Sequence, residues 1–448
     1  MKAIFFCSLL SCASFLSIAS ASTIETDLPY LNQLYQTLHQ HPEVSFEEKE
    51  TSKRLVNELR QIGFEVTEQV GGHGFVGVFK NGQGPTVMLR TDMDALPVLE
   101  KTGLPYASRA KYTDQAGNTL HVMHACGHDI LMTTFMGAAR YLHKHRSAWQ
   151  GTLIMIGQPA EERGQGAKAM LADGLFERFP RPDYNLALHT SASLPAGKLA
   201  YAPEWALANV DSVDITVKGI AGHGAYPHTT KDPVVLASQI VLALQTLVSR
   251  EVSPLDPAVI TIGSIHGGTK HNVISDKVQL QLTVRSYTDA VRKRLLSGIE
   301  RIAKGQAIAF GIPEDKLPTV IVGNESIPSV YNHPKMAKDI ATHLGKYLDH
   351  QNIHETPPVM GGEDFALYGR ATPNIPSVLF WLGAVNPEKF EQAQAKKAQL
   401  PSLHSPYFAP DYQPTIKTGT TALVQAALYL FRNKPKYPDD FHVKFAQK

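Results

Sequence analysis

Residues 86–94 read Thr-Val-Met-Leu-Arg-Thr-Asp-Met-Asp, a short apolar run at Thr86–Leu89 that leads into two acids, Asp92 and Asp94. Two later runs share this form, because each is short, apolar and followed by polar side chains. They are Thr152–Ile156, before Glu161 and Glu162, and Asn185–Leu188, before His189. Such runs, alternating with helical patterns, are typical of an α/β sheet. In open α/β sheets ligands bind beyond the carboxyl ends of the strands, so we expect these polar groups to converge.

The chain has 448 residues, of which 43% are hydrophobic and 19% are charged, and it is long enough for two or more packed domains. Its 43 Lys and Arg nearly balance its 41 Asp and Glu. A nucleic-acid binder usually carries a basic field, so this balance argues against a nucleic-acid partner.

The N-terminus has the pattern of a secretory signal. Lys2 precedes an apolar stretch that runs to Ile18, and Ala19-Ser20-Ala21 has the small residues of a signal-peptidase site. We expect residues 1–21 to be removed and the protein to be exported, to the periplasm or the medium. A lipoprotein cleavage site at Cys12 is an alternative. We expect no other membrane span, and therefore no stable membrane association after cleavage.

Removal of that leader leaves Cys126 as the only cysteine, so no disulfide forms within the mature chain. Cys126 lies in His-Ala-Cys-Gly-His-Asp, residues 124–129, which supplies a thiolate and the His128 imidazole two residues apart. The intervening glycine lets both face one ion, so the motif indicates a metal site. A cysteine nucleophile with His128 as its base is the chemical alternative, and a buried structural thiol is the other.

Two local structures are expected around this motif. Residues 129–146 have helical apolar spacing, with Asp129 as the N-cap. The adjacent Glu161 and Glu162 are expected to point in opposed directions, so that one binds metal while its neighbour stays free as a base. Taken singly, His189 and His404 are more typical of satisfied core histidines than of ligands.

The pattern changes after about Trp205. Strand-like runs and helices follow in the order β-α-β-β-α, which is typical of a two-layer α+β sandwich. These elements are expected at Asp211–Lys218, from Asp232 to about Arg250, at Ala258–Ile265, at Lys277–Tyr287 and at 289–309. We therefore predict a catalytic α/β domain in two parts, residues 22–208 and 325–448, interrupted by an inserted domain at residues 209–324.

Taken together, the motifs resemble the amidohydrolase branch of the M20 family of metallopeptidases, which includes hippurate hydrolases, N-acyl-amino-acid amidohydrolases and indole-acetyl-amino-acid hydrolases. The resemblance covers nearly the whole mature chain. Its motifs are LRTDMDALP at 89–97, HACGHD at 124–129, QPAEE at 158–162, LH at 188–189, GHGAYPH at 222–228, HNVIS at 271–275, EDF at 363–365 and LHSP at 403–406. Two departures are Leu131, where the family usually has histidine, and Arg163, where glycine commonly follows the paired glutamates.

This resemblance implies a zinc-exopeptidase-like α/β domain, with a mixed sheet flanked by helices, and an inserted lid or dimerisation domain. It implies two divalent ions per subunit, with zinc favoured by the thiolate and manganese, cobalt or nickel as alternatives. The implied ligands are Cys126, His128, Glu162, His189 and His404. Glu161 would be the general base and Asp92 a supporting carboxylate.

On the inserted domain, the resemblance implies that His223 stabilises the developing oxyanion, that Asn272 contacts the substrate and that Arg285 binds its α-carboxylate. It also implies a homodimer or higher oligomer, and it leaves open whether His223 reaches the metals of its own subunit or those of the neighbouring subunit. The expected reaction is hydrolysis of N-acyl amino acids to a carboxylic acid and an amino acid. A related exopeptidase acting on short peptides, as carboxypeptidase or dipeptidase, and a non-catalytic exported metal- or ligand-binding protein are the alternatives.

Overall fold

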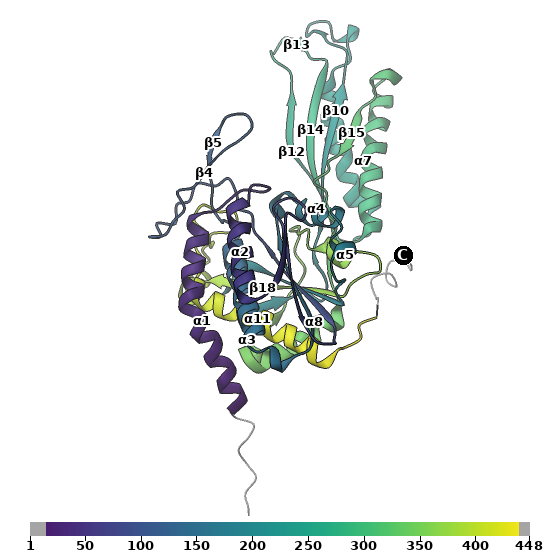
Figure 1. The fold of residues 1–448 in the computed structure, drawn as a ribbon. Helices are drawn as coiled ribbons and strands as arrows, with labels where there is room; N and C mark the ends of the chain where they lie inside the picture. The colour runs from purple at the N-terminus through teal and green to yellow at the C-terminus, as the bar shows by residue number, and fades with distance from the viewer. Residues whose placement is uncertain (1–14, 439–448) are drawn as a thin grey trace, which may run out of the picture.

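The computed structural model describes residues 15–438, with side chains from Ile24 onward (Figure 1). A mixed eight-stranded sheet forms the centre of the larger part of the molecule. Its strand order is β1 (Glu65–Glu68), β2 (Phe75–Asn81), β6 (Gly151–Gln158), β3 (Thr86–Asp92), β7 (Tyr184–Pro195), β18 (Ser377–Val385), β8 (Leu199–Tyr201) and β17 (Ile353–Glu355). Strands β6, β3, β7 and β18 are mutually parallel. The predicted α/β class is thus confirmed.

Helices cover both faces of this sheet, and the side chains of each strand alternate between them. Val87 and Leu89 of β3 join the core on one face, whereas Met88 joins the core on the other. The first face carries α1 (Phe15–Gln40), α2 (Lys49–Ile62), α3 (His128–Lys144), α8 (Pro334–Leu348) and α11 (Tyr412–Asn433). The second carries the short helices α4 (Gly166–Ala172), α5 (Leu175–Arg178) and α9 (Ala366–Gly369).

Two further expectations concern the leader and the start of α3. The predicted leader, with Cys7 and Cys12, lies outside the described residues as far as position 14. The cap of α3 was predicted wrongly, because the helix begins at His128 with Gly127 as its N-cap, in the left-handed region at φ 78°. Asp129 instead lies in the first turn, where its carboxylate contacts the His39 ring at 2.7 Å.

A second, antiparallel sheet extends away from the first as an arm (Figure 1). Its strands are β12 (Ala258–Gly267), β14 (Lys277–Ser286), β10 (Asn209–Lys218) and β15 (Thr319–Val322), in that order. Helices α6 (Pro233–Thr246) and α7 (Asp289–Ala309) pack on it through Leu236, Ile240, Leu295 and Ile299. The two-stranded ribbon of β11 (Gly222–His223) and β13 (Val273–Ile274) lies at its outer end. All these elements lie within residues 209–324, the range that we propose as the insert.

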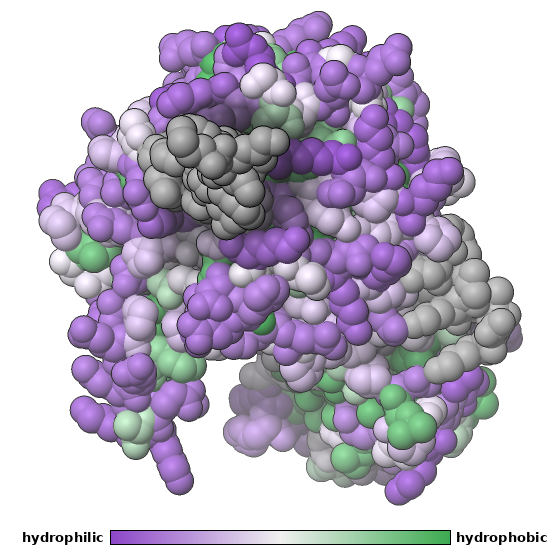
Figure 2. Space-filling view, turned by 90° about the horizontal axis from the view of Figure 1, so that it is seen from below, coloured by the Kyte–Doolittle hydropathy of each residue, from purple (hydrophilic) through white to green (hydrophobic). Residues whose placement is uncertain are grey.

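Smaller elements complete the described chain. They are β4 (Lys111–Thr113), β5 (Thr119–His121), β9 (Glu204–Leu207), β16 (Val330–Asn332) and α10 (Pro387–Lys396). The surface seen from below is largely hydrophilic, with apolar residues gathered at the lower right of the view (Figure 2).

The sequence predicts no membrane span apart from the leader, but one other helical stretch has the length and composition of such a span. By length and composition, Pro233–Glu251, which is α6 with the π-helical turn after it, is apolar enough to cross a membrane, with a mean hydropathy of 1.4. One third of that stretch is buried, and its buried face packs on the second sheet. Length and composition do not distinguish such a helix from a membrane span.

Candidate metal centre

The parallel order of β6, β3 and β7 brings the carboxyl ends of these strands to one edge of the sheet. Asp92, the last residue of β3, lies opposite Gln158, the last residue of β6. Glu161 and Glu162 follow in a 3₁₀ turn. His189 lies inside β7 rather than after it, because that strand continues to Pro195.

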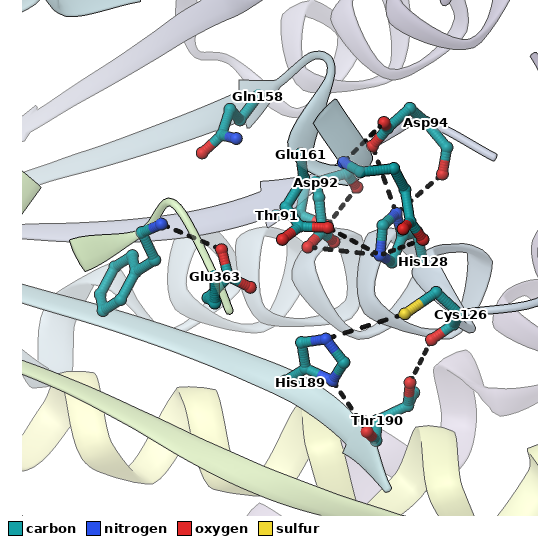
Figure 3. Close-up of polar contacts among 12 residues, drawn as sticks. Thr91, Asp92, Asp94, Cys126, His128, Gln158, Glu161, His189, Thr190 and Glu363 are labelled. Carbon is teal, nitrogen blue, oxygen red and sulfur yellow. Dashed lines mark hydrogen bonds and ion pairs between the residues drawn. The ribbon is translucent and has the colours of Figure 1, made fainter. Parts of the chain in front are cut away.

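The loop before α3 adds Cys126 to this edge, and His128, the first residue of α3, lies beside it (Figure 3). Among the described residues, the candidate ligand atoms fall into four overlapping groups, and within each group they all lie within 4.8 Å of one another. Three contain predicted ligands: Cys126 with His128 and His189, Cys126 with Glu162 and His404, and Asp92 with His128 and Glu161. The fourth is Glu161 with Glu363 and Asp364. The fold therefore gathers all five predicted ligands, together with Glu161 and Asp92.

Hydrogen bonds turn two histidines so that each presents Nε2 to the centre. His128 Nδ1 lies 2.7 Å from the Asp94 carbonyl oxygen, and His189 Nδ1 lies 2.8 Å from that of Thr190. A carbonyl only accepts, so each Nδ1 carries a proton, and in the neutral ring Nε2 keeps its lone pair. His189 Nε2 is 3.8 Å from Cys126 Sγ. This is the tautomer that a metal-binding imidazole requires.

The paired glutamates differ from expectation. The Glu161 and Glu162 carboxylates both lie 3.8 Å from His128 Nε2, so they face one centre rather than opposite sides. A 3₁₀ turn, unlike an extended segment, does not send successive side chains to opposite faces. Glu162 also lies 3.4 Å from His404 Nε2, whereas Glu161 is grouped with Asp92.

The donor set fits divalent cations. Three buried polar atoms at this centre have no hydrogen-bond partner among the described residues: His128 Nε2, Asp92 Oδ1 and Glu162 Oε1. Orphaned buried groups of this kind are costly, and cations bound at this centre would satisfy them. Thiolate, imidazole and carboxylate ligands suit zinc, and the imidazoles and carboxylates suit the other divalent metals as well.

Burial and local charge shift the acids of the centre. Burial, Glu363 and Glu162 raise the pKa of Glu161 well above its usual value. Burial raises the pKa of Glu162 to about 7, against the opposing effect of His128. Burial, with Glu162 adding to it, also raises the pKa of the Cys126 thiol. Positive charge at the centre would reverse these shifts, since it favours the anionic forms.

The residues predicted on the arm separate into two places. Arg285, near one end of β14, lines the same cleft as Cys126, Glu161 and His404, and it donates through Nη1 to the Met360 carbonyl at 2.5 Å. His223 and Asn272 are exposed at the outer end of the arm, away from this cleft within one chain (Figure 1).

A fully buried arginine was not assigned a role from the sequence. The Arg90 guanidinium contacts Asp92 at 2.8 Å, Glu363 at 2.8 Å and Asp364 at 3.2 Å. It also donates to Gln158 at 2.9 Å. The sequence did indicate that Arg90 is buried, because it directly follows an apolar strand run. A buried charge of this kind needs a partner of opposite charge.

The two departures from the family pattern lie in different surroundings. Leu131 is buried in the helical core on α3. Arg163 lies at the cleft, where its Nη2 is 3.2 Å from Glu325, a residue that follows the second sheet.

This arrangement defines a class of protein: a hydrolase in which thiolate, imidazole and carboxylate side chains would hold divalent metal beside the Glu161 carboxylate. Residues 88–428 match peptidase family M20/M25/M40, so the chain belongs to that family, and it is a metal-dependent amidohydrolase within it.

Similar proteins include two enzymes and one solved structure. Hippurate hydrolase of Campylobacter jejuni is 39% identical over 337 residues, which cover 74% of this chain and 82% of that protein. Thermostable carboxypeptidase 1 of Saccharolobus solfataricus is 34% identical over 410 residues, 90% and 96% of the two chains. The crystal structure of Bacillus subtilis YXEP protein, a dinuclear metal binding peptidase from the M20 family, aligns with a TM-score of 0.73 at 27% identity and covers 91% of this chain and 99% of that one.

Proposed function

We propose that this protein hydrolyses the amide bond of N-acyl amino acids and releases a carboxylic acid and a free amino acid. One observation carries the proposal: Arg285 lines the cleft that also contains Glu161 and four of the five predicted metal ligands. A guanidinium is suited to bind a carboxylate, and an N-acyl amino acid presents its carboxylate close to the amide that is cleaved. Hippurate hydrolase, a relative, supports this substrate class.

The cleft is also suited to an apolar acyl group. It has a volume of about 390 Å³, and part of its wall is apolar. The apolar side chains are Leu207, Val210, Ile327, Trp381 and Leu403. A ligand site of this kind combines apolar walls with a few placed polar groups that fix orientation. The cleft therefore suits a molecule with an apolar end and an anionic end.

The side chains have distinct parts in the reaction. Cys126, His128, Glu162, His189 and His404 would hold two divalent ions, which when bound would supply Lewis-acid chemistry at the amide carbonyl. Glu161 accepts a proton from the attacking water at its carboxylate oxygen and then delivers that proton to the leaving amine nitrogen. Arg285 binds the carboxylate of the substrate and so contributes to its affinity.

A second candidate function uses the same centre. Thermostable carboxypeptidase 1, also a relative, supports release of a C-terminal residue from a short peptide. The N-acyl amino acid and the short peptide would both place a free carboxylate beside Arg285. Only the group on the other side of the scissile amide distinguishes the two substrates. We further propose zinc as the metal, export to the periplasm or medium, and assembly of at least a dimer.

A substrate panel tests the assignment. Full-length protein is loaded separately with zinc, manganese, cobalt or nickel and assayed on N-benzoylglycine, N-acetyl amino acids and dipeptides. We expect the highest kcat/KM on an N-acyl amino acid, and loss of activity on chelation with recovery on adding metal. Preference for dipeptides would establish the exopeptidase, and no turnover of any amide would establish a binding protein.

A further inference from the structure

The residue before Glu161 has an unusual backbone conformation. Ala160 lies in the left-handed region, at φ 49° and ψ 42°, although it is not glycine. It is fully buried, and its carbonyl accepts hydrogen bonds from the Gln165 and Gly166 amides at 3.3 and 3.2 Å. Left-handed conformations are unfavourable for alanine and persist only where surrounding contacts hold them.

A single side chain satisfies the amide of this residue. The Ala160 N–H donates to Glu48 Oε1 at 2.7 Å. Glu48 is itself fully buried in the loop just before α2, 112 residues earlier in the chain. The same oxygen accepts the Phe46 amide at 2.9 Å. Without Glu48 the Ala160 amide would be a buried donor with no partner, which is costly.

Glu162, two residues after Ala160, is supported indirectly by the loop that contains Glu48. Asp94 Oδ2 accepts the Glu162 amide at 3.0 Å and the Ser45 hydroxyl at 2.6 Å. Residues 45–48 therefore support both ends of the short segment that contains Glu161, once directly through Glu48 and once through Asp94. Glu48 does not line the cleft and is in none of the metal-ligand groups.

We propose that Glu48 is a positioning residue for the general base: its hydrogen bond to the Ala160 amide fixes the left-handed turn that directs the Glu161 carboxylate into the metal centre. This role rests on the proposed function, because it assigns Glu161 as the base. A small displacement of a catalytic group is enough to lower turnover strongly.

The chemistry of Glu48 allows a sharp pair of variants. Burial, with the nearby Asp94, raises the pKa of Glu48 to about 8. Glu48→Gln keeps a planar group of the same length, with an oxygen that accepts both amides; its amino group takes the place of Oε2, which has no hydrogen-bond partner among the described residues. Glu48→Ala removes the acceptor. Glu48→Asp shortens the side chain by one methylene and so moves the acceptor away from the amides. The aspartate variant replaces the alanine variant in the experiment if the latter does not fold.

The experiment compares these variants as metal-loaded, full-length proteins. We expect Glu48→Ala or Glu48→Asp to lower kcat by about 10- to 100-fold with little change in KM and with metal content intact. Glu48→Gln should keep kcat close to wild type. Hydrogen exchange of the peptide spanning residues 158–162 should be faster in Glu48→Ala and unchanged in Glu48→Gln.

Glu43 provides the matched control. It lies in the same loop, and its carboxylate accepts the Glu50 and Thr51 amides at the start of α2, at 3.1 and 2.8 Å. Glu43→Ala should therefore lower Tm without lowering kcat.

Three results would overturn the positioning role: equal kcat losses in the Glu48→Ala and Glu43→Ala variants, a Glu48→Gln variant as impaired as Glu48→Ala, or a loss of metal that accounts for the loss of rate. If wild type cleaves only dipeptides, the proposed function fails, and the same comparison is made on that substrate. Hydrogen exchange needs no turnover, so equal exchange in wild type and Glu48→Ala overturns the role even in a protein that cleaves nothing.

Discussion

The Glu161 carboxylate lies among other acidic side chains. Its carboxylate is buried beside Glu363 and Glu162, which raise its pKa together with burial. A carboxyl group with a raised pKa keeps its proton at neutral pH. It must lose that proton before it can act as a base. The positive charge that the five ligands are built to hold would lower that pKa again. The same cluster that binds metal therefore prepares Glu161 to accept a proton.

Two variants of the paired glutamates separate these roles. Glu161→Gln should keep two metals per subunit and lose at least about 100-fold in kcat, because it removes the proton carrier and spares the ligands. Glu162→Gln should lose metal, because Glu162 is grouped with Cys126 and His404. Metal analysis beside kinetics measures both. A Glu161→Gln protein that lacks metal would mean that the roles of the two glutamates are exchanged.

Single residues were predictable where a motif names them, and not where a distant partner decides their state. The ligands follow one another in short motifs with the chemistry of a metal site. Arg90 follows an apolar run that indicates burial, but its partner Glu363 lies 273 residues away, and nothing near Glu48 in the sequence indicates its partner Ala160, 112 residues away. A buried charge is explained by the groups around it, which only the fold brings together.

Among the elements, β14 connects the two ends of the arm. It pairs with β10 along its whole length, and its Lys277 end lies near the β11–β13 ribbon, whereas Arg285 reaches the cleft. Its alternating buried positions pack against α6 and α7, so Arg285 is carried by a rigid strand. A site residue on such an element is held more firmly than one on a loop.

Loss of this arginine should affect binding rather than chemistry. Arg285→Ala is expected to raise KM for N-acyl amino acids by about 10- to 100-fold, the usual scale for a hydrogen bond to a charged group, and to leave kcat largely unchanged. Acyl amides without a carboxylate should show no change. Arg292→Ala, which removes a pair with Asp211 at 2.6 Å on the same arm, is the control and should lower only stability. An equal rise in KM for both substrate types would exclude carboxylate binding.

Elements were predictable where periodicity and local caps agree. α6 begins after Asp232, whose carboxylate accepts the Val234 amide at 2.8 Å, as the Asp-Pro pattern indicates. The two-residue strands β11 and β13 are too short to give a pattern. The prediction of Asp129 as the cap of α3 was wrong. The Asp129 carboxylate instead contacts His39, a residue far away in the sequence. Local preference alone does not reveal such a contact.

At the scale of the whole molecule, one chain keeps His223 far from its own metal ligands. Lys277 and Arg285 are separated by about 26 Å along β14, at the rise of a strand. His223 lies beyond the Lys277 end, since Gly219 donates to the Asp276 carbonyl and β11 pairs with Val273–Ile274. A histidine that stabilises an oxyanion must lie at the reacting amide. We therefore propose that His223 acts in the cleft of a second subunit.

Subunit mixing tests this arrangement. His223→Ala alone should lower kcat by about 10²- to 10³-fold with metal content intact, as expected for loss of one oxyanion donor. A heterodimer of His223→Ala and Glu161→Gln subunits has one complete site, formed by Glu161 of one chain and His223 of the other. Unfolding and refolding an equal mixture should restore about a quarter of wild-type activity, and purified heterodimers about a half, because half of random dimers are mixed and each has one intact site. Recovery should be absent when both subunits carry His223→Ala. No recovery in verified heterodimers would show that each chain completes its own site, which requires the arm to fold back over its own cleft.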